Sequence, residues 1–121
     1  MILQIVDKEF AICKTETLPT DFLLKDFTFV SKTDKELSIL CETKEIPPNP
    51  LTVEDGWYCF RIAEDASFEK YGMIAFLAEI IAEQKTSTLV VGTYDTDYLF
   101  VKKDRFPVVI QALKEHGCSF L

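Results

Sequence analysis

The chain has 121 residues, enough for one compact domain or for two small halves that share a core. Hydrophobic residues make up 48% of the sequence, so a substantial core can be buried. Twenty acidic against thirteen basic residues give a net charge of −7, which opposes binding to nucleic acid and to anionic membrane surfaces, and neither is expected as a partner.

The start of the chain has no pattern of a leader or a membrane anchor. Residues 1–4 ("MILQ") run directly into a strand-like alternation, without a basic leader and a small-residue cleavage site. The longest apolar run is also too short to span a bilayer. We therefore expect a cytoplasmic protein.

Strands are predicted for the first third of the chain. In residues 9–15 ("EFAICKT") the side chains alternate with a period of two, which is typical of a half-buried strand. A break with turn-forming residues follows. Residues 27–32 ("FTFVSK") and 36–42 ("ELSILCE") are two further β-rich runs, and residues 33–35 between them predict a hairpin.

Three prolines interrupt residues 43–56 ("TKEIPPNPLTVEDG"). Because proline fixes the backbone and removes a hydrogen-bond donor, this stretch is predicted to be a linker or an edge segment. We place an internal boundary at its end, near Asp55 and Gly56. The predicted halves are residues 1–56 and residues 57–121.

The second half begins with a strand, a helix and a hairpin. Residues 57–64 ("WYCFRIAE") predict the strand, on which Arg61 is expected to pair with a nearby carboxylate. Residues 72–84 ("GMIAFLAEIIAEQ") predict the helix, with Glu79 and Glu83 facing water. Residues 87–94 ("STLVVGTY") and 98–102 ("YLFVK") predict the two strands of the hairpin. The apolar positions of the helix, spaced at i, i+3, i+4 and i+7, are Ile74, Leu77, Ala78 and Ile81.

A second helix and a short strand close the chain. Residues 105–116 ("RFPVVIQALKEH") predict the helix, with Asp104 as its N-cap and Gly117 at its end. Residues 118–121 ("CSFL") predict the strand. The second half thus has the order β-α-β-β-α-β of a ferredoxin-like unit.

The first half shows a weaker version of the same order. Its helices are reduced to turns, expected around residues 18–24 and residues 51–55. We therefore predict an α+β fold built from tandem ferredoxin-like βαββαβ units, with a degenerate first copy. A half of about 60 residues is marginal alone, so the halves are expected to share one core or sheet.

Cysteine and histidine give no pattern for catalysis or metal binding. No cysteine lies in a C-x-x-C pair, and His116 is the single histidine of the sequence. Neither a zinc site nor a thiol–imidazole pair is therefore predicted. We expect no catalytic residues, no metal, no cofactor and no enzymatic activity. The four cysteines, expected to be reduced and buried, are Cys13, Cys41, Cys59 and Cys118.

A small-ligand site is predicted where the first helix of the second half begins. Gly72 has no side chain, so a ligand carboxylate can approach the backbone amides of Met73 and Ile74. Acceptors for an ammonium group follow at the end of the next strand. That strand is expected to lie beside the strand leading into the helix, so the two groups can converge. The second group is Thr93, Asp95, Thr96 and Asp97.

Residues 72–101 ("GMIAFLAEIIAEQKTSTLVVGTYDTDYLFV") are similar to the signature of ACT domains, small regulatory modules that bind amino acids. Further matching stretches are residues 10–14 ("FAICK"), 36–41 ("ELSILC") and 56–62 ("GWYCFRI"). More closely, the chain resembles a bacterial family of tandem-ACT proteins of mostly unassigned role. That family is related to the ACT modules of aspartate kinases and of the CASTOR arginine sensors.

The resemblance implies a ligand site at the meeting of two ACT units. Gly72, Met73 and Ile74 would contact a ligand carboxylate through their backbone. Asp97 would meet a cationic group of the ligand, and Asp95 would shape the turn. Thr93 and Tyr94 would lie along the same wall as Asp97, with Thr96 between the two carboxylates. Because the first half has no second glycine-loop motif, we expect at most one good site per chain, completed by the first half or by a second chain.

The resemblance also implies a function. The leading hypothesis is a non-enzymatic regulatory protein that binds an amino acid or a similar small metabolite and signals this to a regulated protein partner. A homodimer is expected, because the edges of a small sheet have to be covered. The alternative hypothesis is a structural or protein-interaction module in which the ligand site is vestigial.

Overall fold

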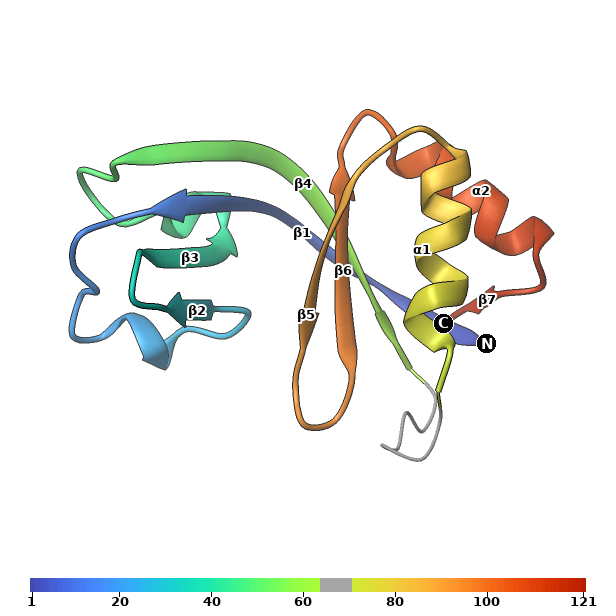
Figure 1. Cartoon of the computed structure of the whole chain (residues 1–121), viewed down its shortest axis with the longest axis horizontal. Coiled ribbons are helices and arrows are strands. Elements are labelled where there is room, and N and C mark those ends of the chain that lie inside the picture. Colours follow the sequence, from blue (N-terminus) through green and yellow to red (C-terminus); the bar gives the residue numbers. More distant parts are fainter. Residues whose placement is uncertain (64–70) are drawn as a thin grey trace. The chain divides into compact units, whose positions relative to one another are not determined.

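The computed structural model describes residues 1–63 and 71–121, which form a mixed α+β fold (Figure 1). The strands follow the order β2-β3-β1-β4-β6-β5, and β7 pairs with β1 outside this path. The chain divides into two compact units. Unit 1 comprises Met1–Asp7 and Tyr58–Leu121, and unit 2 comprises Lys8–Trp57. β1 (Ile2–Lys14) and β4 (Thr52–Ile62) each contribute residues to both units.

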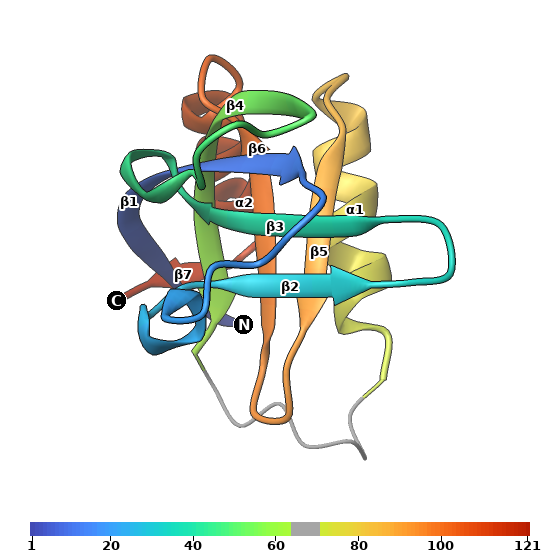
Figure 2. The ribbon, with the colours of Figure 1, turned by 90° about the vertical axis from the view of Figure 1, so that its left-hand side faces the viewer.

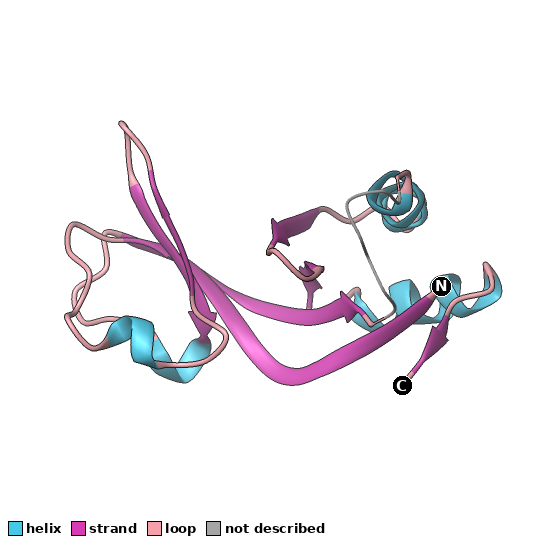
Figure 3. Ribbon diagram, turned by 90° about the horizontal axis from the view of Figure 1, so that it is seen from below, coloured by secondary structure: helices cyan, strands magenta, loops and turns pink. Residues whose placement is uncertain are grey.

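Unit 1 confirms the order β-α-β-β-α-β predicted for the second half. After β4 the elements are α1 (Met73–Glu83), β5 (Thr88–Gly92), β6 (Asp97–Lys102), α2 (Phe106–Glu115) and β7 (Ser119–Phe120). Both helices cover the same face of the strands (Figure 3). Between sheet and helices lies a core that includes Leu3, Phe60, Leu77, Leu99 and Val109.

The start of β1 belongs to unit 1, although the sequence places it in the first half. β7 pairs in parallel with the beginning of β1, with Ile2 opposite Ser119 and Leu3 opposite Phe120. β1 therefore lies between β7 and β4 in the sheet order. Local sequence patterns cannot show this insertion, because it joins the two ends of the chain.

α1 has the predicted position and the predicted exposed face. It begins directly after Gly72, and Leu77, Ile80 and Ile81 are its buried residues. Glu79 and Glu83 are exposed, as expected. Neither α1 nor α2 is long and apolar enough to cross a membrane, and the same holds for every helix of the described residues.

The predicted N-cap of α2 is wrong. Asp104 lies before the capping position, which is occupied by Arg105 without a capping side-chain hydrogen bond. The reason is a backbone turn after β6, in which the Arg105 N–H donates to the Lys102 carbonyl over 3.0 Å. The guanidinium of Arg105 donates instead to the carbonyl of Gln84 at the end of α1, over 2.7 Å.

Unit 2 has short turns where unit 1 has helices. From β1 the chain passes through the 3-10 helix η1 (Phe22–Leu24), β2 (Phe29–Lys32), β3 (Leu37–Glu42) and the 3-10 helix η2 (Thr43–Glu45) to β4. The hairpin predicted between β2 and β3 is confirmed, with Lys32 opposite Leu37. Unit 2 has a small core of its own, which contains Cys13, Phe22, Ile39 and Cys41.

The turn expected around residues 51–55 is wrong, because these residues enter β4. The Leu51 N–H donates to the Lys14 carbonyl over 2.8 Å, and the strand then runs from Thr52 to Ile62. Gly56, near which the sequence predicts the boundary between the halves, lies inside this strand with φ of +81°. The turn expected around residues 18–24 is present as η1.

Candidate functional site

The turn between β5 and β6 is held by two threonines. The Thr93 hydroxyl and the Thr93 N–H both donate to the Thr96 carbonyl, over 2.9 and 2.8 Å. The Thr96 N–H in turn donates to the Thr93 hydroxyl over 3.2 Å. The Thr96 hydroxyl donates to the Ile62 carbonyl over 2.6 Å, so the turn is fixed to the end of β4.

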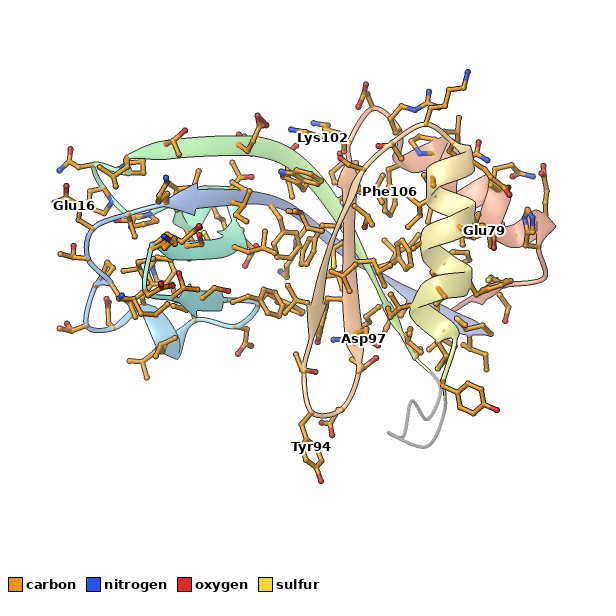
Figure 4. The ribbon with its side chains drawn as sticks, in the orientation of Figure 1. Glu16, Glu79, Tyr94, Asp97, Lys102 and Phe106 are labelled. Carbon is orange, nitrogen blue, oxygen red and sulfur yellow. The ribbon has the colours of Figure 1, made fainter. Side chains whose placement is uncertain are left out.

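The other residues of the turn point in different directions. Tyr94 is 84% exposed and projects from the tip of the hairpin, whereas Asp97 lies farther back on β6 (Figure 4). Asp95 is exposed, and Asp97 is half-buried. Because side chains alternate along a strand, Asp97 shares its face of the sheet with Leu99, which packs against the helices. Of the two carboxylates, Asp97 is therefore the one on the face that carries α1.

Gly92 leaves the space that Asp97 uses. The two residues lie opposite each other in the β5–β6 ladder. A Cβ at position 92 would lie 3.1 Å from Oδ1 of Asp97, closer than an ordinary van der Waals contact. Because position 92 has no side chain, the Asp97 carboxylate can lie close to the backbone of β5.

Gly72 starts α1 in a conformation that suits glycine. Its φ of +82° lies in the left-handed region, and the position of a Cβ there is open space. The first N–H groups of an α-helix lack partners within the helix and carry partial positive charge. Met73 and Ile74 supply the first of these N–H groups, while their side chains pack against the core of unit 1.

The start of α1 and the β5–β6 turn lie at the same end of unit 1 (Figures 1 and 2). The predicted reason for this placement needs a correction. The strand that ends near Thr93 was expected to neighbour β4, but β5 is the edge strand, and β6 lies between it and β4. The turn therefore reaches the end of β4 through Thr96, and Asp97 opens the strand that pairs with β4. Residues 64–70, including the predicted strand residue Glu64, lie outside the described residues.

Sequence reasoning missed a network around Arg61. Nε and Nη2 of Arg61 donate to Oε1 of Gln4 over 3.2 and 3.0 Å, and Nη1 donates to the hydroxyl of Tyr98 over 3.1 Å. The sequence predicts a carboxylate partner, but among the described residues the side chains that accept from Arg61 are neutral. Only the strand register, which a single sequence does not show, brings these three residues together.

None of the four cysteines forms a disulfide, and all four are buried. Burial raises the pKa of the Cys41 and Cys59 thiols from 9.0 to about 12, and burial also raises the pKa of Cys13. In the part of the chain that the structure describes, no group of three metal-ligating side chains is present.

We predict slow thiol modification and a loss of stability at alkaline pH. A thiol whose pKa is higher in the folded state stabilises the fold fully below its unfolded pKa. This contribution is lost as the pH rises from about 9 toward 12. Reaction with a disulfide reagent near neutral pH should be slow for the native chain and fast in denaturant, and the denaturant midpoint should fall above about pH 9. Rapid modification of native Cys41 and Cys59 would contradict the prediction.

Comparisons with known proteins were made for the sequence and for the fold. A family model described as ACT domain matches residues 52–115, which run from the start of β4 to the end of α2. No curated protein matches the sequence.

Solved structures resemble nearly the whole chain. A crystal structure of an Agobacterium tumefaciens protein is 27% identical, with a TM-score of 0.88 over 99% of this chain and 91% of that one. A Vibrio cholerae protein of unknown function is 20% identical, with a TM-score of 0.74 over 93% of this chain and 87% of that one. An aspartate kinase of Clostridium acetobutylicum, described as an allosteric enzyme, is 9% identical, with a TM-score of 0.65 over 88% of this chain and 32% of the kinase.

Proposed function

The chain belongs to the ACT-domain family, and on this premise we propose that it is a non-enzymatic regulatory protein that binds an amino acid or a similar small metabolite. The observation that carries the proposal is the placement of Asp97 on the helix-bearing face of the sheet, at the end of unit 1 where α1 begins. A carboxylate and a helix N-terminus are complementary to the two charges of an amino acid.

In the proposed site, backbone amides and the Asp97 carboxylate hold opposite ends of the ligand. The N–H groups at Gly72, Met73 and Ile74 bind the ligand carboxylate, and Asp97 accepts hydrogen bonds from a cationic group. Thr93 and Thr96 hold the turn in place through the hydrogen bonds described above. Asp95 shapes the turn, and the exposed Tyr94 contacts the ligand or a second chain.

We also propose that the chain is a tandem-ACT protein whose first copy, residues 1–56, is degenerate and whose second copy is residues 57–121. The strand order supports this. The strands of unit 2 lie side by side in the order β2-β3-β1-β4, so the second and third strands are followed by the first and the fourth. The strands β4 to β7 of unit 1 lie in the corresponding order β5-β6-β4-β7, with the start of β1 inserted between β4 and β7. We further propose that the two copies are related to the ACT modules of aspartate kinases and of the CASTOR arginine sensors.

Assembly and location complete the proposal. β2 and β5 end the strand order, and exposed strand edges are places where a second chain can pair, so a homodimer is proposed. Ligand occupancy would then be signalled to a regulated protein partner. Four cysteines without a disulfide suit a reducing compartment, which supports the cytoplasm as the proposed location.

A thermal-shift screen of the full chain tests the proposed function. The compounds are the standard amino acids and common small effectors at millimolar concentration. A ligand present at about 100 times its dissociation constant adds about 2.7 kcal/mol to the free energy of unfolding, which raises the melting temperature by several degrees. If no compound shifts the transition, the ligand-binding function is wrong, and a structural or protein-interaction module is the better description.

A further inference from the structure

Unit 2 contains a hollow of 340 Å³ between its two 3-10 turns. η1 precedes β2 and η2 follows β3. Since β2 and β3 are antiparallel, both turns lie at the same end of this hairpin (Figure 2). Turns this short cover less of a sheet than the two helices of unit 1 do. The hollow therefore lies where unit 2 has 3-10 turns in the chain positions that helices take in unit 1.

The lining of the hollow combines apolar residues with charged ones. Phe22 is only 1% exposed and belongs to the core of unit 2, against which Ile46 also packs. Pro19, Pro47 and Pro48 line the hollow as well, and proline restricts the backbone. Small-molecule sites commonly have volumes of about 300–1,000 Å³. This hollow has the size of a site for a small metabolite.

The charged residues of the hollow balance one another. Two anions, Asp21 and Glu45, and two cations, Lys25 and Lys44, line the hollow, so the lining has a net charge of zero in a chain of net charge −7. Nζ of Lys44 also lies 3.9 Å from Oε1 of Glu42, which is not a lining residue. A ligand with one positive and one negative group matches such a lining. A ligand with a single charge would meet two lining groups of the same sign, and it would have no opposite charge to pair with them.

The ion pair at the hollow keeps free hydrogen-bonding capacity. Nζ of Lys25 donates to Oε2 of Glu45 over 2.7 Å and lies 5.1 Å from the centre of the Phe22 ring. An ammonium group has three donors and a carboxylate has two oxygens, so each partner can also contact a ligand. The hydrogen bond raises the pKa of Lys25 and lowers the pKa of Glu45, which keeps both charged near neutral pH.

We propose that this hollow is a second binding site, distinct from the site at α1 and Asp97, and that it takes an α-amino acid in its zwitterionic form. Lys25 and Lys44 bind the ligand carboxylate, Asp21 and Glu45 accept from its ammonium group, and the side chain lies against Ile46 and Pro19. The proposal does not depend on the proposed function of unit 1, since every residue of the hollow belongs to unit 2.

Titration of the full chain, followed by the backbone amide signals in NMR, tests this site. Leucine and phenylalanine should perturb the signals of Phe22, Lys25 and Ile46 in a saturable way. N-acetyl-leucine has no ammonium group and leucinamide has no carboxylate, so each should bind at least about tenfold more weakly, because hydrogen bonds to charged groups are lost. The proposal is overturned if the amino acids leave these signals unchanged, or if the blocked compounds bind as well as leucine.

Charge-removing variants give an independent readout. Lys25→Met keeps most of the alkyl chain, and Glu45→Gln keeps the shape of the side chain. Each should weaken leucine binding about tenfold. Lys35→Met is the control, because Lys35 is exposed in the turn between β2 and β3, at the opposite end of this hairpin from the hollow, and this variant should bind leucine as the unchanged chain does. Equal affinity in all three variants would overturn the proposal. If a variant fails to fold, the titrations of the unchanged chain with N-acetyl-leucine and leucinamide still test the proposal. Signals that move only around Gly72 and Asp97 would support the site of unit 1 and overturn this one.

Discussion

Asp97→Asn is expected to weaken binding of an amino acid by about ten- to a hundredfold. The substitution keeps the shape of the side chain but removes the negative charge that we propose to pair with the cationic group of the ligand. A hydrogen bond to a charged group contributes about 1.5–3 kcal/mol, and each 1.4 kcal/mol corresponds to a factor of ten in affinity. Isothermal titration with the compound that gives the largest thermal shift measures the change.

Asp95→Asn is the matched control for this variant. Asp95 has the same side chain two residues away, but it is exposed on the turn. Its replacement should change affinity by less than about threefold, as expected for a screened surface charge. Equal losses for Asp95→Asn and Asp97→Asn would mean that the net charge of the turn attracts the ligand and that the position of Asp97 is unimportant.

Gly92→Ala tests the same placement without touching a charge. The added Cβ would lie 3.1 Å from Oδ1 of Asp97, so the carboxylate has to move. The affinity for the amino acid should fall, as it is expected to do in the Asp97→Asn variant. Unchanged affinity in Gly92→Ala would show that the present position of the carboxylate is not the one that binds the ligand.

Features with a local sequence signal could be predicted. The period of α1 and the turn residues between β2 and β3 act over a few neighbours, so both elements were located correctly. Features that depend on partners far away in the sequence could not be predicted. Leu51 begins an extended strand because Lys14 supplies its hydrogen-bond acceptor, and no pattern within residues 51–55 reports that partner.

The candidate site shows the same division. The sequence predicts the hairpin and places Thr93, Asp95, Thr96 and Asp97 at its turn. Which strand the turn contacts depends on the sheet order, and the bond from Thr96 to Ile62 shows that this strand is β4. The hollow of unit 2 had no sequence signal, because its residues come from two turns separated by the whole β2–β3 hairpin.

Leu77→Ala is expected to lower the free energy of unfolding by about 2–5 kcal/mol. Leu77 is fully buried in the core of unit 1, where α1 faces strands β4 and β6. Removing three side-chain carbons loses their transfer free energy and leaves a cavity that the surrounding residues fill only in part. Domains of this size are stable by about 5–15 kcal/mol, so this single change can remove a large part of the total. Urea unfolding measures the loss.

Glu79→Ala separates burial from helix content as the cause of that loss. Glu79 lies on the exposed side of the same helix (Figure 4), and alanine at either position has a favourable helix propensity. Its replacement should change the free energy of unfolding by no more than about 0.5 kcal/mol. A small loss for Leu77→Ala as well would mean that α1 is not fixed on the sheet by its apolar face. The position of the Gly72 amides would then no longer be set by the core, and the proposed ligand site would lose its rigid wall.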